Sequence, residues 1–300
     1  MDSSTYVLVT PARNEEEHIK RTIQSVIRQT VLPKKWVIVN DGSTDRTGEI
    51  VSRYAARYQF IELLTRQRDG GRNFGSQACA TEAGIALLGG VEYEFIGILD
   101  ADISLPPEYY ETIMAKFREI PNLGIAGGAI YDLCFGKFVR QRCWTNSVPG
   151  GIQFFHRKTL EDVGGFIPQP KGGHDAVAEA AARMRGWEVR SFPDIAVWHH
   201  RRTGTAKQNI FTARFRQGAK EYSLGYHPIF EIVKCLYRIK EPPYAIGGIT
   251  TMLGYCWAFL HKQERRVPDD VVNYLRGEQL RRLTRFFTKK NEQLPRGVKA

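Results

Sequence analysis

The chain has 300 residues, of which 42% are hydrophobic and 25% charged, a composition that is ordinary for a globular protein and excludes one that is mainly disordered. Its net charge of +11 is unevenly distributed: residues 201–300 carry 20 Lys and Arg against 8 Asp and Glu, whereas residues 1–200 carry 23 against 24. A basic segment of this kind attracts nucleic acid, anionic lipid or a phosphorylated substrate, and charge alone does not choose among these partners.

The cysteines and the N-terminus both indicate a cytoplasmic protein. The five cysteines are scattered and form no CxxC pair, as expected of thiols in a reducing compartment. The first apolar run, residues 6–10, lacks the basic start and the length of a signal peptide.

Strand-like and helix-like patterns alternate through the first hundred residues. The expected strands are short apolar runs, and the expected helices carry apolar residues at a spacing of three or four. This alternation predicts a parallel sheet with crossover helices. The expected strands cover residues 6–10, 36–39, 60–64 and 95–99, and the expected helices cover residues 14–29, 45–58 and 72–88.

Three of these strands end in polar loops, at residues 11–14, 40–43 and 100–102. Ligands of open α/β sheets bind beyond the carboxyl ends of the strands. The three loops are therefore expected to line one crevice.

The second half of the chain is less regular. It contains an expected helix at residues 107–120, a strand at 125–131 and an Ala-rich helix at 175–185, followed by two short strands at 189–192 and 195–198. After His200 the pattern changes to long, basic, amphipathic helices. There, residues 244–260 are apolar but number only 17, the lower limit for spanning a bilayer, so we expect an interfacial hairpin with basic flanks suited to anionic headgroups.

Asp100 and Asp102 are the strongest chemical feature, because two carboxylates one residue apart at a strand end can both turn toward Mg²⁺ or Mn²⁺. Placing them together without a cation would be costly. The alternative is that they cap the following helix. His199 and His200, which follow another apolar run, offer an imidazole ligand that favours Mn²⁺, or else form a pair on a basic surface.

Other polar residues suit the handling of a phosphorylated substrate. Asp175 follows Gly172-Gly173-His174 at the start of a helix, where it can act as a general base or simply as an N-cap. Arg13, Arg72 and Asn73 lie in or beside the expected crevice, and guanidinium groups match phosphates and uracil-type acceptors.

Four motifs in order resemble those of glycosyltransferase family 2, and the resemblance covers roughly residues 5–225. They are residues 9–15 (VTPARNE), similar to the first strand and nucleotide loop, 39–45 (VNDGSTD), similar to DDGSxD, 72–75 (RNFG), similar to RNxG, and 100–102 (DAD), similar to DxD. The resemblance implies the GT-A fold, a Rossmann-like α/β fold whose mostly parallel sheet is flanked by helices, here with a basic helical extension.

The resemblance also implies roles for single residues. Asp102 would ligate the metal, with His199 as a second ligand, and Asp175 falls at the position of the catalytic base. Asp100 would contact the ribose or the metal, and His200 is the alternative imidazole. The donor-binding residues implied are Pro11, Ala12, Arg13, Glu15, Asn40, Asp41, Arg72, Asn73, Asp100 and Ala101, and the acceptor-side residues are Gly150, Gly151 and His174.

Two positions depart from the family pattern. Asn40 stands where many members have Asp, which leaves the nucleotide base open. His174 replaces the usual Glu before the base, so the tuning of Asp175 can differ.

The implied activity is the transfer of a sugar with inversion, dependent on Mn²⁺ or Mg²⁺. The donor would be a nucleotide-diphosphate sugar, with UDP favoured, and the acceptor a glycan or lipid-linked sugar in polysaccharide or glycolipid assembly. We expect a catalytic domain at residues 1–225, divided into a nucleotide half (1–105) and an acceptor half (106–225). Residues 226–300 would be an extension able to contact an anionic membrane, at the inner face of the cell membrane.

Other classes of protein match the sequence less well. The first loop lacks the GxGxxG of a dinucleotide oxidoreductase and the Gly-rich phosphate loop of a sugar-nucleotide pyrophosphorylase. The basic last third leaves a nucleic-acid-binding or scaffold protein with a non-catalytic nucleotide-binding domain as the alternative, which steeply salt-dependent binding to RNA or DNA would favour. We expect no nucleic-acid partner.

Overall fold

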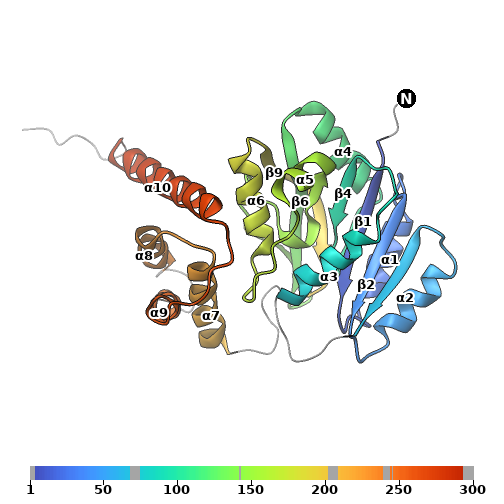
Figure 1. Cartoon of the computed structure of the whole chain (residues 1–300), viewed down its shortest axis with the longest axis horizontal. Helices are drawn as coiled ribbons and strands as arrows, with labels where there is room; N and C mark the ends of the chain where they lie inside the picture. The colour runs from blue at the N-terminus through green and yellow to red at the C-terminus, as the bar shows by residue number, and fades with distance from the viewer. Residues whose placement is uncertain are drawn as a thin grey trace, which may run out of the picture. The chain divides into compact units, whose positions relative to one another are not determined.

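The structure is a computed structural model that describes residues 4–67, 75–141, 143–201, 209–238, 244 and 246–292. The chain forms two compact units, Met1–Thr205 and Ala206–Ala300, of which the first is α/β and the second helical (Figure 1).

The first half of the α/β unit has the expected alternation of strands and helices. Its elements are β1 (Tyr6–Ala12), α1 (Ile19–Ile27), β2 (Lys35–Asp41), α2 (Thr47–Ala55), β3 (Ile61–Arg66), α3 (Gly75–Ala86) and β4 (Phe95–Ile98). Strands β3, β2, β1 and β4 lie side by side in this order, and all their pairings are parallel. Strand β1 is buried along nearly its whole length, as expected for a strand covered on both faces.

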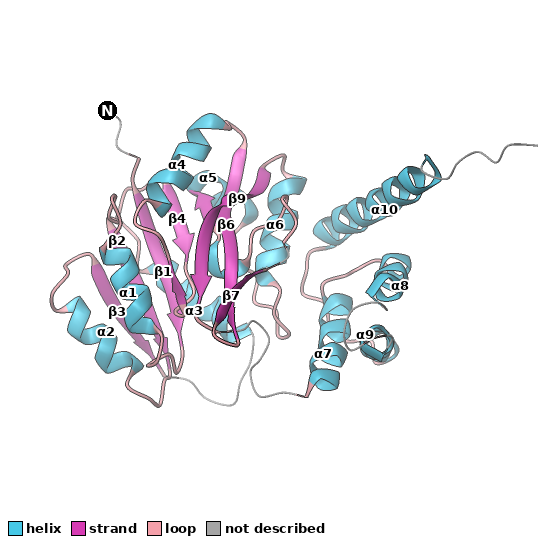
Figure 2. Cartoon of the chain, turned by 180° about the vertical axis from the view of Figure 1, so that it is seen from behind, coloured by secondary structure: helices cyan, strands magenta, loops and turns pink. Residues whose placement is uncertain are grey.

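The second half adds the other side of the sheet. Its elements are β5 (Ile103–Ser104), α4 (Tyr109–Glu119), β6 (Leu123–Cys134), β7 (Lys137–Arg140), η1 (Gly150–Ile152), β8 (Phe154–His156), α5 (Arg157–Val163), α6 (His174–Met184) and β9 (Glu188–His199). The sheet order is β3-β2-β1-β4-β8-β6-β9-β5, with β7 paired to β6. Helices α1, α2 and α4 cover one face and α3, α5 and α6 the other (Figures 1 and 2).

The α/β fold class is confirmed, and parallel pairing continues in the second half between β6 and β9, where antiparallel pairs also occur. Strand β8 runs antiparallel to both β4 and β6, and β5 runs antiparallel to β9. The two short strands expected at residues 189–192 and 195–198 form the single strand β9. The ladder between β6 and β9 contains a register shift between Gly127 and Ala129. The extra residues opposite this point belong to β9 and include Pro193, so they form a bulge in that strand.

Large aromatic side chains fill the core under the sheet. Tyr6, Trp36, Phe95 and Phe154 are fully buried. The ring of Phe154 stacks on that of Phe95, with 5.5 Å between centroids, so the short strand β8 is held by side-chain packing as well as by backbone pairing.

The second unit consists of α7 (Ile210–Ser223), α8 (Pro228–Tyr237), α9 (Ile246–Leu260) and α10 (Asp269–Glu292). The expected domain boundary at residue 225 falls inside this unit. Helix α7 belongs to it because Gly218 packs so closely against the backbone of α9 that no side chain would fit there. The interfacial hairpin expected at residues 244–260 is wrong, since α9 is one continuous helix. No helix in the described part of the chain has both the length and the apolar character needed to cross a bilayer.

Candidate active site

The loops after β1 and β2 are joined by hydrogen bonds at the carboxyl edge of the sheet. The Asn14 amide donates to Ser43 Oγ at 3.1 Å, and the Thr44 amide donates to Asn14 Oδ1 at 2.8 Å. The Glu15 amide donates to Thr47 Oγ1 at 2.8 Å. Asn14 has a positive φ of 54°, which Asn tolerates better than most residues. Two of the three expected loops therefore form one rigid structure.

Asp100, at the end of β4, lies against a glycine of the turn that precedes β8. Its amide donates to the Gly151 carbonyl at 2.9 Å, and its Oδ1 accepts from Gln77 Nε2 at 3.1 Å. A Cβ at Gly151 would lie only 2.5 Å from Asp100 Oδ2. The absence of a side chain at this position thus leaves the space that the Asp100 carboxylate uses.

Asp175 uses the neighbouring glycine in the same way. It lies in the first turn of α6, and a Cβ at Gly150 would lie 2.6 Å from its Oδ2. The Gly150-Gly151 pair therefore separates the carboxylates of Asp175 and Asp100 by little more than backbone.

His199, at the end of β9, links two carboxylates. Its Nε2 lies 3.0 Å from Asp102 Oδ2, and its Nδ1 lies 2.7 Å from Asp132 Oδ1. Although burial lowers it, the hydrogen bond that the imidazole donates to Asp102 raises the pKa of His199 to about 9. His200 points elsewhere, with its Nε2 2.8 Å from Ser104 Oγ. Of the two histidines, the structure brings His199 to the acids.

Arg201 and Glu15 complete this cluster. Arg201 Nε contacts Asp102 Oδ2, and its Nη2 donates to Glu15 Oε1 at 2.9 Å. Burial, and after it the charge of Asp102, raises the pKa of Glu15 and that of Asp100 to about 7. The clustered carboxylates thus repel one another, and this edge of the sheet favours a cation.

The donor set fits a divalent metal ion in chemistry but not yet in arrangement. Asp102 Oδ1 and Glu15 Oε2 are buried and have no hydrogen-bond partner in the described structure, so oxygen atoms remain for a cation. Within the described ranges, no three His, Cys, Asp or Glu side chains already form a metal-binding group. The positive charges next to Asp102 are the Arg201 guanidinium and the protonated His199 imidazole instead.

The remaining donor-side residues are arranged around the same loops. Pro11 and Ala12 end β1, and Arg13, which follows them, has a buried Nη1 without a hydrogen-bond partner in the described structure. Asn40 Oδ1 accepts from the Ser43 amide at 3.1 Å, so Asn40 stabilises the turn after β2. Asp41 Oδ2 accepts from Ser76 Oγ at 2.5 Å.

Of four further expected residues, the structure describes two. Ala101 is buried, and its carbonyl accepts from Thr22 Oγ1 at 2.7 Å. His174 begins α6, with its ring 5.7 Å from that of Phe166. Arg72 and Asn73 fall outside the described residues.

The sequence reasoning missed three residues of the site. Asp132 pairs in register with His199 across β6 and β9, and it directly follows the strand expected at residues 125–131, so the rule used for the other loops would have found it. Arg201 follows the two histidines, and in sequence it is one more basic residue of the basic last third. Buried Glu179 was missed as well: its Oε1 accepts from the Val148 amide at 2.6 Å and from Gln153 Nε2 at 3.2 Å, which holds the segment that leads to Gly150.

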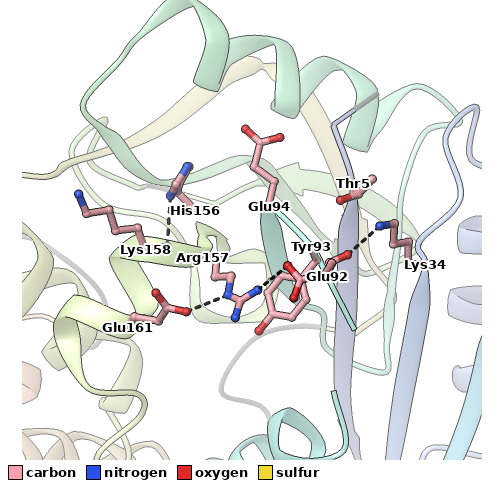
Figure 3. A pocket seen from close by; sticks show the side chains of 9 residues that line it. All are labelled: Thr5, Lys34, Glu92, Tyr93, Glu94, His156, Arg157, Lys158 and Glu161. Carbon is pink, nitrogen blue, oxygen red and sulfur yellow. Dashed lines mark hydrogen bonds and ion pairs between the residues drawn. The ribbon is translucent and has the colours of Figure 1, made fainter. Parts of the chain in front are cut away.

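A hollow of about 570 Å³ lies at the opposite edge of the sheet, by the residues that precede β1, β2 and β4 (Figure 3). Two of its cationic groups have partners: Lys34 Nζ donates to the Glu92 carbonyl at 2.8 Å, and Arg157 Nε donates to Glu161 Oε1 at 2.8 Å. Since this edge carries the amino ends of the parallel strands, we place the active site at the other one.

Comparison with known proteins identifies the family. The sequence model described as Glycosyl transferase family 2 matches residues 7–171. The probable glycosyltransferase YdaM of Bacillus subtilis is 27% identical over 214 residues, which cover 63% of this chain and 49% of YdaM. The poly-beta-1,6-N-acetyl-D-glucosamine synthase of Staphylococcus epidermidis is 28% identical over 206 residues, 62% of this chain and 47% of the synthase. The chain spans about half the length of these two relatives.

Solved structures share the fold. S. aureus TarS 1–349 in complex with UDP-GlcNAc superposes with a TM-score of 0.53 at 16% identity, over 86% of this chain and 73% of that one. The mannosyltransferase PcManGT from Pyrobaculum calidifontis, in complex with GDP-Man and Mn²⁺, gives a TM-score of 0.53 at 17% identity, over 94% and 79%. Because the family match runs from the first strand to the segment just before Asp175, over more than half of the chain, this protein belongs to glycosyl transferase family 2.

Proposed function

We propose that this protein is a metal-dependent, inverting glycosyltransferase that moves a sugar from a nucleotide-diphosphate donor, a UDP-sugar by preference, to an acceptor hydroxyl. One observation carries the proposal: Asp100 and Asp175 lie against the adjacent glycines Gly151 and Gly150 at the carboxyl edge of the sheet. Two further groups, Asp102 and His199, lie at the same edge.

Asp102 and His199 would hold Mn²⁺ or Mg²⁺, with Asp100 as a further oxygen ligand. The imidazole of His199 favours Mn²⁺, and the PcManGT complex contains this ion. When bound, the ion would offset the charge that develops on the departing diphosphate. Arg201 then has to leave Asp102, and the diphosphate oxygens are suitable new partners for its guanidinium.

The nucleotide would lie on the two hydrogen-bonded loops after β1 and β2. Asp41 and Arg13 are the side chains there that can bind polar groups of a nucleoside or phosphate. TarS was solved with UDP-GlcNAc and PcManGT with GDP-Man, so both bases occur on this fold. We favour UDP, the nucleotide of the TarS complex, and the donor panel described below distinguishes UDP from GDP.

Asp175 would act as the general base. As the acceptor oxygen attacks the anomeric carbon, its proton passes to the Asp175 carboxylate, and the bond from that carbon to the diphosphate oxygen breaks on the opposite face. The single displacement inverts the configuration. The first turn of α6 fixes Asp175, and Gly150 lets the carboxylate lie close to the backbone of the turn beside it.

The acceptor would be a glycan or a lipid-linked sugar in polysaccharide or glycolipid assembly. The polysaccharide synthases among the relatives support this class. A cytoplasmic enzyme at the inner face of the membrane would meet both a soluble donor and such an acceptor.

The test uses Asp175→Asn, with Asp194→Asn, an exposed carboxylate of β9, as the matched control. We expect Asp175→Asn to lose about 10²–10⁴-fold in sugar transfer, because the base is gone, while the rise in Tm on adding UDP and Mn²⁺ is kept. The control should keep both. Nucleotide release measured over a panel of UDP- and GDP-sugars, with and without Mn²⁺, identifies the donor. Full turnover by Asp175→Asn would remove this residue from the mechanism.

A further inference from the structure

Helix α9 buries a face made mostly of small residues and exposes most of its large apolar ones. The buried face consists of Gly247, Gly248, Thr251, Gly254, Tyr255 and Ala258. The opposite face carries large apolar side chains spaced three or four residues apart, which lie on one stripe of a helix. These are Ile246, Ile249, Leu253, Trp257 and Leu260, with exposed fractions of 53%, 59%, 57%, 42% and 75%, and we call them the α9 stripe.

The small face of α9 is required by close packing against α7. A Cβ at Gly254 would lie 2.0 Å from the Phe215 carbonyl oxygen, and a Cβ at Gly218 would lie 1.8 Å from that of Thr251. The backbones therefore touch. Close approach through small residues, with large apolar residues directed outward, is the packing pattern of helices that contact lipid.

Helix α8 shows the same inversion. Its exposed residues Ile229, Ile232 and Leu236 share one face, with exposed fractions of 56%, 49% and 59%. Its charged residues point inward: Lys234 Nζ lies 2.5 Å from Glu221 Oε2 of α7 and 2.6 Å from Glu231 Oε2. Charged side chains, which usually lie on the surface, are thus buried, and large apolar side chains, which are usually buried, are exposed.

Basic residues stand next to the exposed apolar residues. Lys262, Arg265 and Arg266 are exposed and follow Leu260, the last residue of the α9 stripe, within six positions, and Arg266 pairs with the exposed Glu264 at 3.2 Å. The segment that contains these helices, residues 201–300, carries 20 Lys and Arg against 8 Asp and Glu. A positive rim beside an apolar surface complements a bilayer with anionic headgroups and matches neither water nor an ordinary protein surface.

We propose that the helical unit docks on an anionic lipid bilayer, with the α9 stripe and the exposed face of α8 inserted at the boundary between headgroups and acyl chains, and with Lys262, Arg265 and Arg266 on the headgroups. Helix α9 has 15 residues, about 22 Å at 1.5 Å per residue. The helix therefore lies in the plane of the interface and does not cross the membrane. This docking is independent of the sugar-transfer reaction proposed above.

Flotation of the full chain with vesicles tests the proposal. We expect binding to vesicles of phosphatidylglycerol and phosphatidylcholine that weakens with salt, and little binding to phosphatidylcholine alone. The triple variant Ile249→Ser, Leu253→Ser, Leu260→Ser should lower the partition coefficient more than about 10-fold. Leu32→Ser, a leucine of similar exposure in the α/β unit, is the matched control and should bind like the parent.

Quenching by brominated lipids locates the inserted face. Trp257 lies in the α9 stripe, and Trp144, 75% exposed, lies in the α/β unit. Trp257→Phe should lose the quenching of tryptophan fluorescence, while Trp144→Phe should keep it. Both side chains are exposed, so the fold is retained, which circular dichroism checks.

Three results would overturn the docking surface. One is recovery of the parent chain in the supernatant with anionic vesicles at low salt. Another is undiminished quenching in Trp257→Phe. The third is a concentration-dependent dimer, seen by analytical ultracentrifugation without lipid, that the triple serine variant abolishes while vesicle binding stays unchanged; the stripe would then bind a second copy of the chain.

Discussion

At the scale of single residues, Asp132 has the most specific contact in the candidate site. Its Oδ1 lies 2.7 Å from His199 Nδ1, which leaves Nε2 as the nitrogen directed at Asp102. A carboxylate on the far nitrogen of a ligating histidine fixes the tautomer and the ring orientation. Asp132 is thus a positioning residue for the proposed metal ligand.

Replacing Asp132 by Asn should weaken Mn²⁺ binding about 10–100-fold, because the imidazole is no longer oriented or made more basic by a carboxylate. The dissociation constant can be measured by electron paramagnetic resonance of free Mn²⁺, with UDP present and without any acceptor. Asp194→Asn, an exposed change on the strand that carries His199, is the control. Equal Mn²⁺ affinity in Asp132→Asn and the parent would show that Asp132 only stabilises the fold.

Glu179 gives a prediction for the pH dependence of stability. Burial raises its pKa from 4.5 to about 7, even though the Val148 amide donates to its carboxylate. The folded chain therefore holds this proton more tightly than the unfolded chain does. The stability due to this group is complete below about pH 4.5 and is lost as the pH rises through about 7, an effect of roughly 3 kcal/mol at most.

We expect the free energy of unfolding in urea to fall from pH 5 to pH 8, and to fall less in Glu179→Gln, whose amide cannot ionise. Glu161→Gln, which changes an exposed glutamate of α5, should follow the parent. Identical pH slopes for Glu179→Gln and the parent would mean that Glu179 ionises in the folded state without cost.

Which site residues the sequence could predict depended on where they stand along the chain. Asp100, Asp102 and His199 follow apolar strands, so strand patterning alone put them at one edge. The partners of Arg201 were out of reach, because its contact with Glu15 joins residues 186 positions apart. That pairing exists only once the sheet order places β9 beside the loops of the first strands.

At the scale of elements, strands with long apolar runs were predictable and short ones were not. Strand β8 has three residues and is held by pairing with β4 and β6, which a local pattern cannot reveal. Strand β7 is exposed along its whole length and has no buried face to give it a periodicity. In α9, the sequence shows the apolar pattern but not which face is buried. The face of small residues is buried because it packs against α7.

Gly218→Ala tests how tightly α7 and α9 are packed. The new Cβ would meet the Thr251 carbonyl, part of the backbone, so the helices have to separate, at a cost of about 1–3 kcal/mol or more. Gly277→Ala in α10 is the matched control: the nearest neighbour of its Cβ is Arg281 Nη1 at 3.8 Å, and a gain of up to about 1 kcal/mol in helix stability is expected. Urea unfolding followed by circular dichroism measures both, and a neutral Gly218→Ala would contradict the close contact.

At the scale of the whole molecule, the chain combines two units with different interiors. The α/β unit has the usual apolar core, with Trp36 and Phe154 fully buried. The helical unit buries the ion cluster of Glu221, Glu231 and Lys234, in which Lys234 holds the pKa of Glu221 below its usual value against the effect of burial, while burial and the charge of Glu221 raise the pKa of Glu231 to about 7. Such a difference was visible in the sequence only as the change of charge after residue 200.

Since each unit has its own interior, we expect calorimetry to show two unfolding transitions. UDP with Mn²⁺ at 100 times the dissociation constant should stabilise the α/β unit by about 2.7 kcal/mol and raise the Tm of that transition only. Gly218→Ala should lower only the other one, and Glu179→Gln should change only the first. A single transition that ligand and Gly218→Ala both shift would show that the two units unfold as one cooperative body, and the stability of the candidate active site would then depend on the packing of α7 against α9.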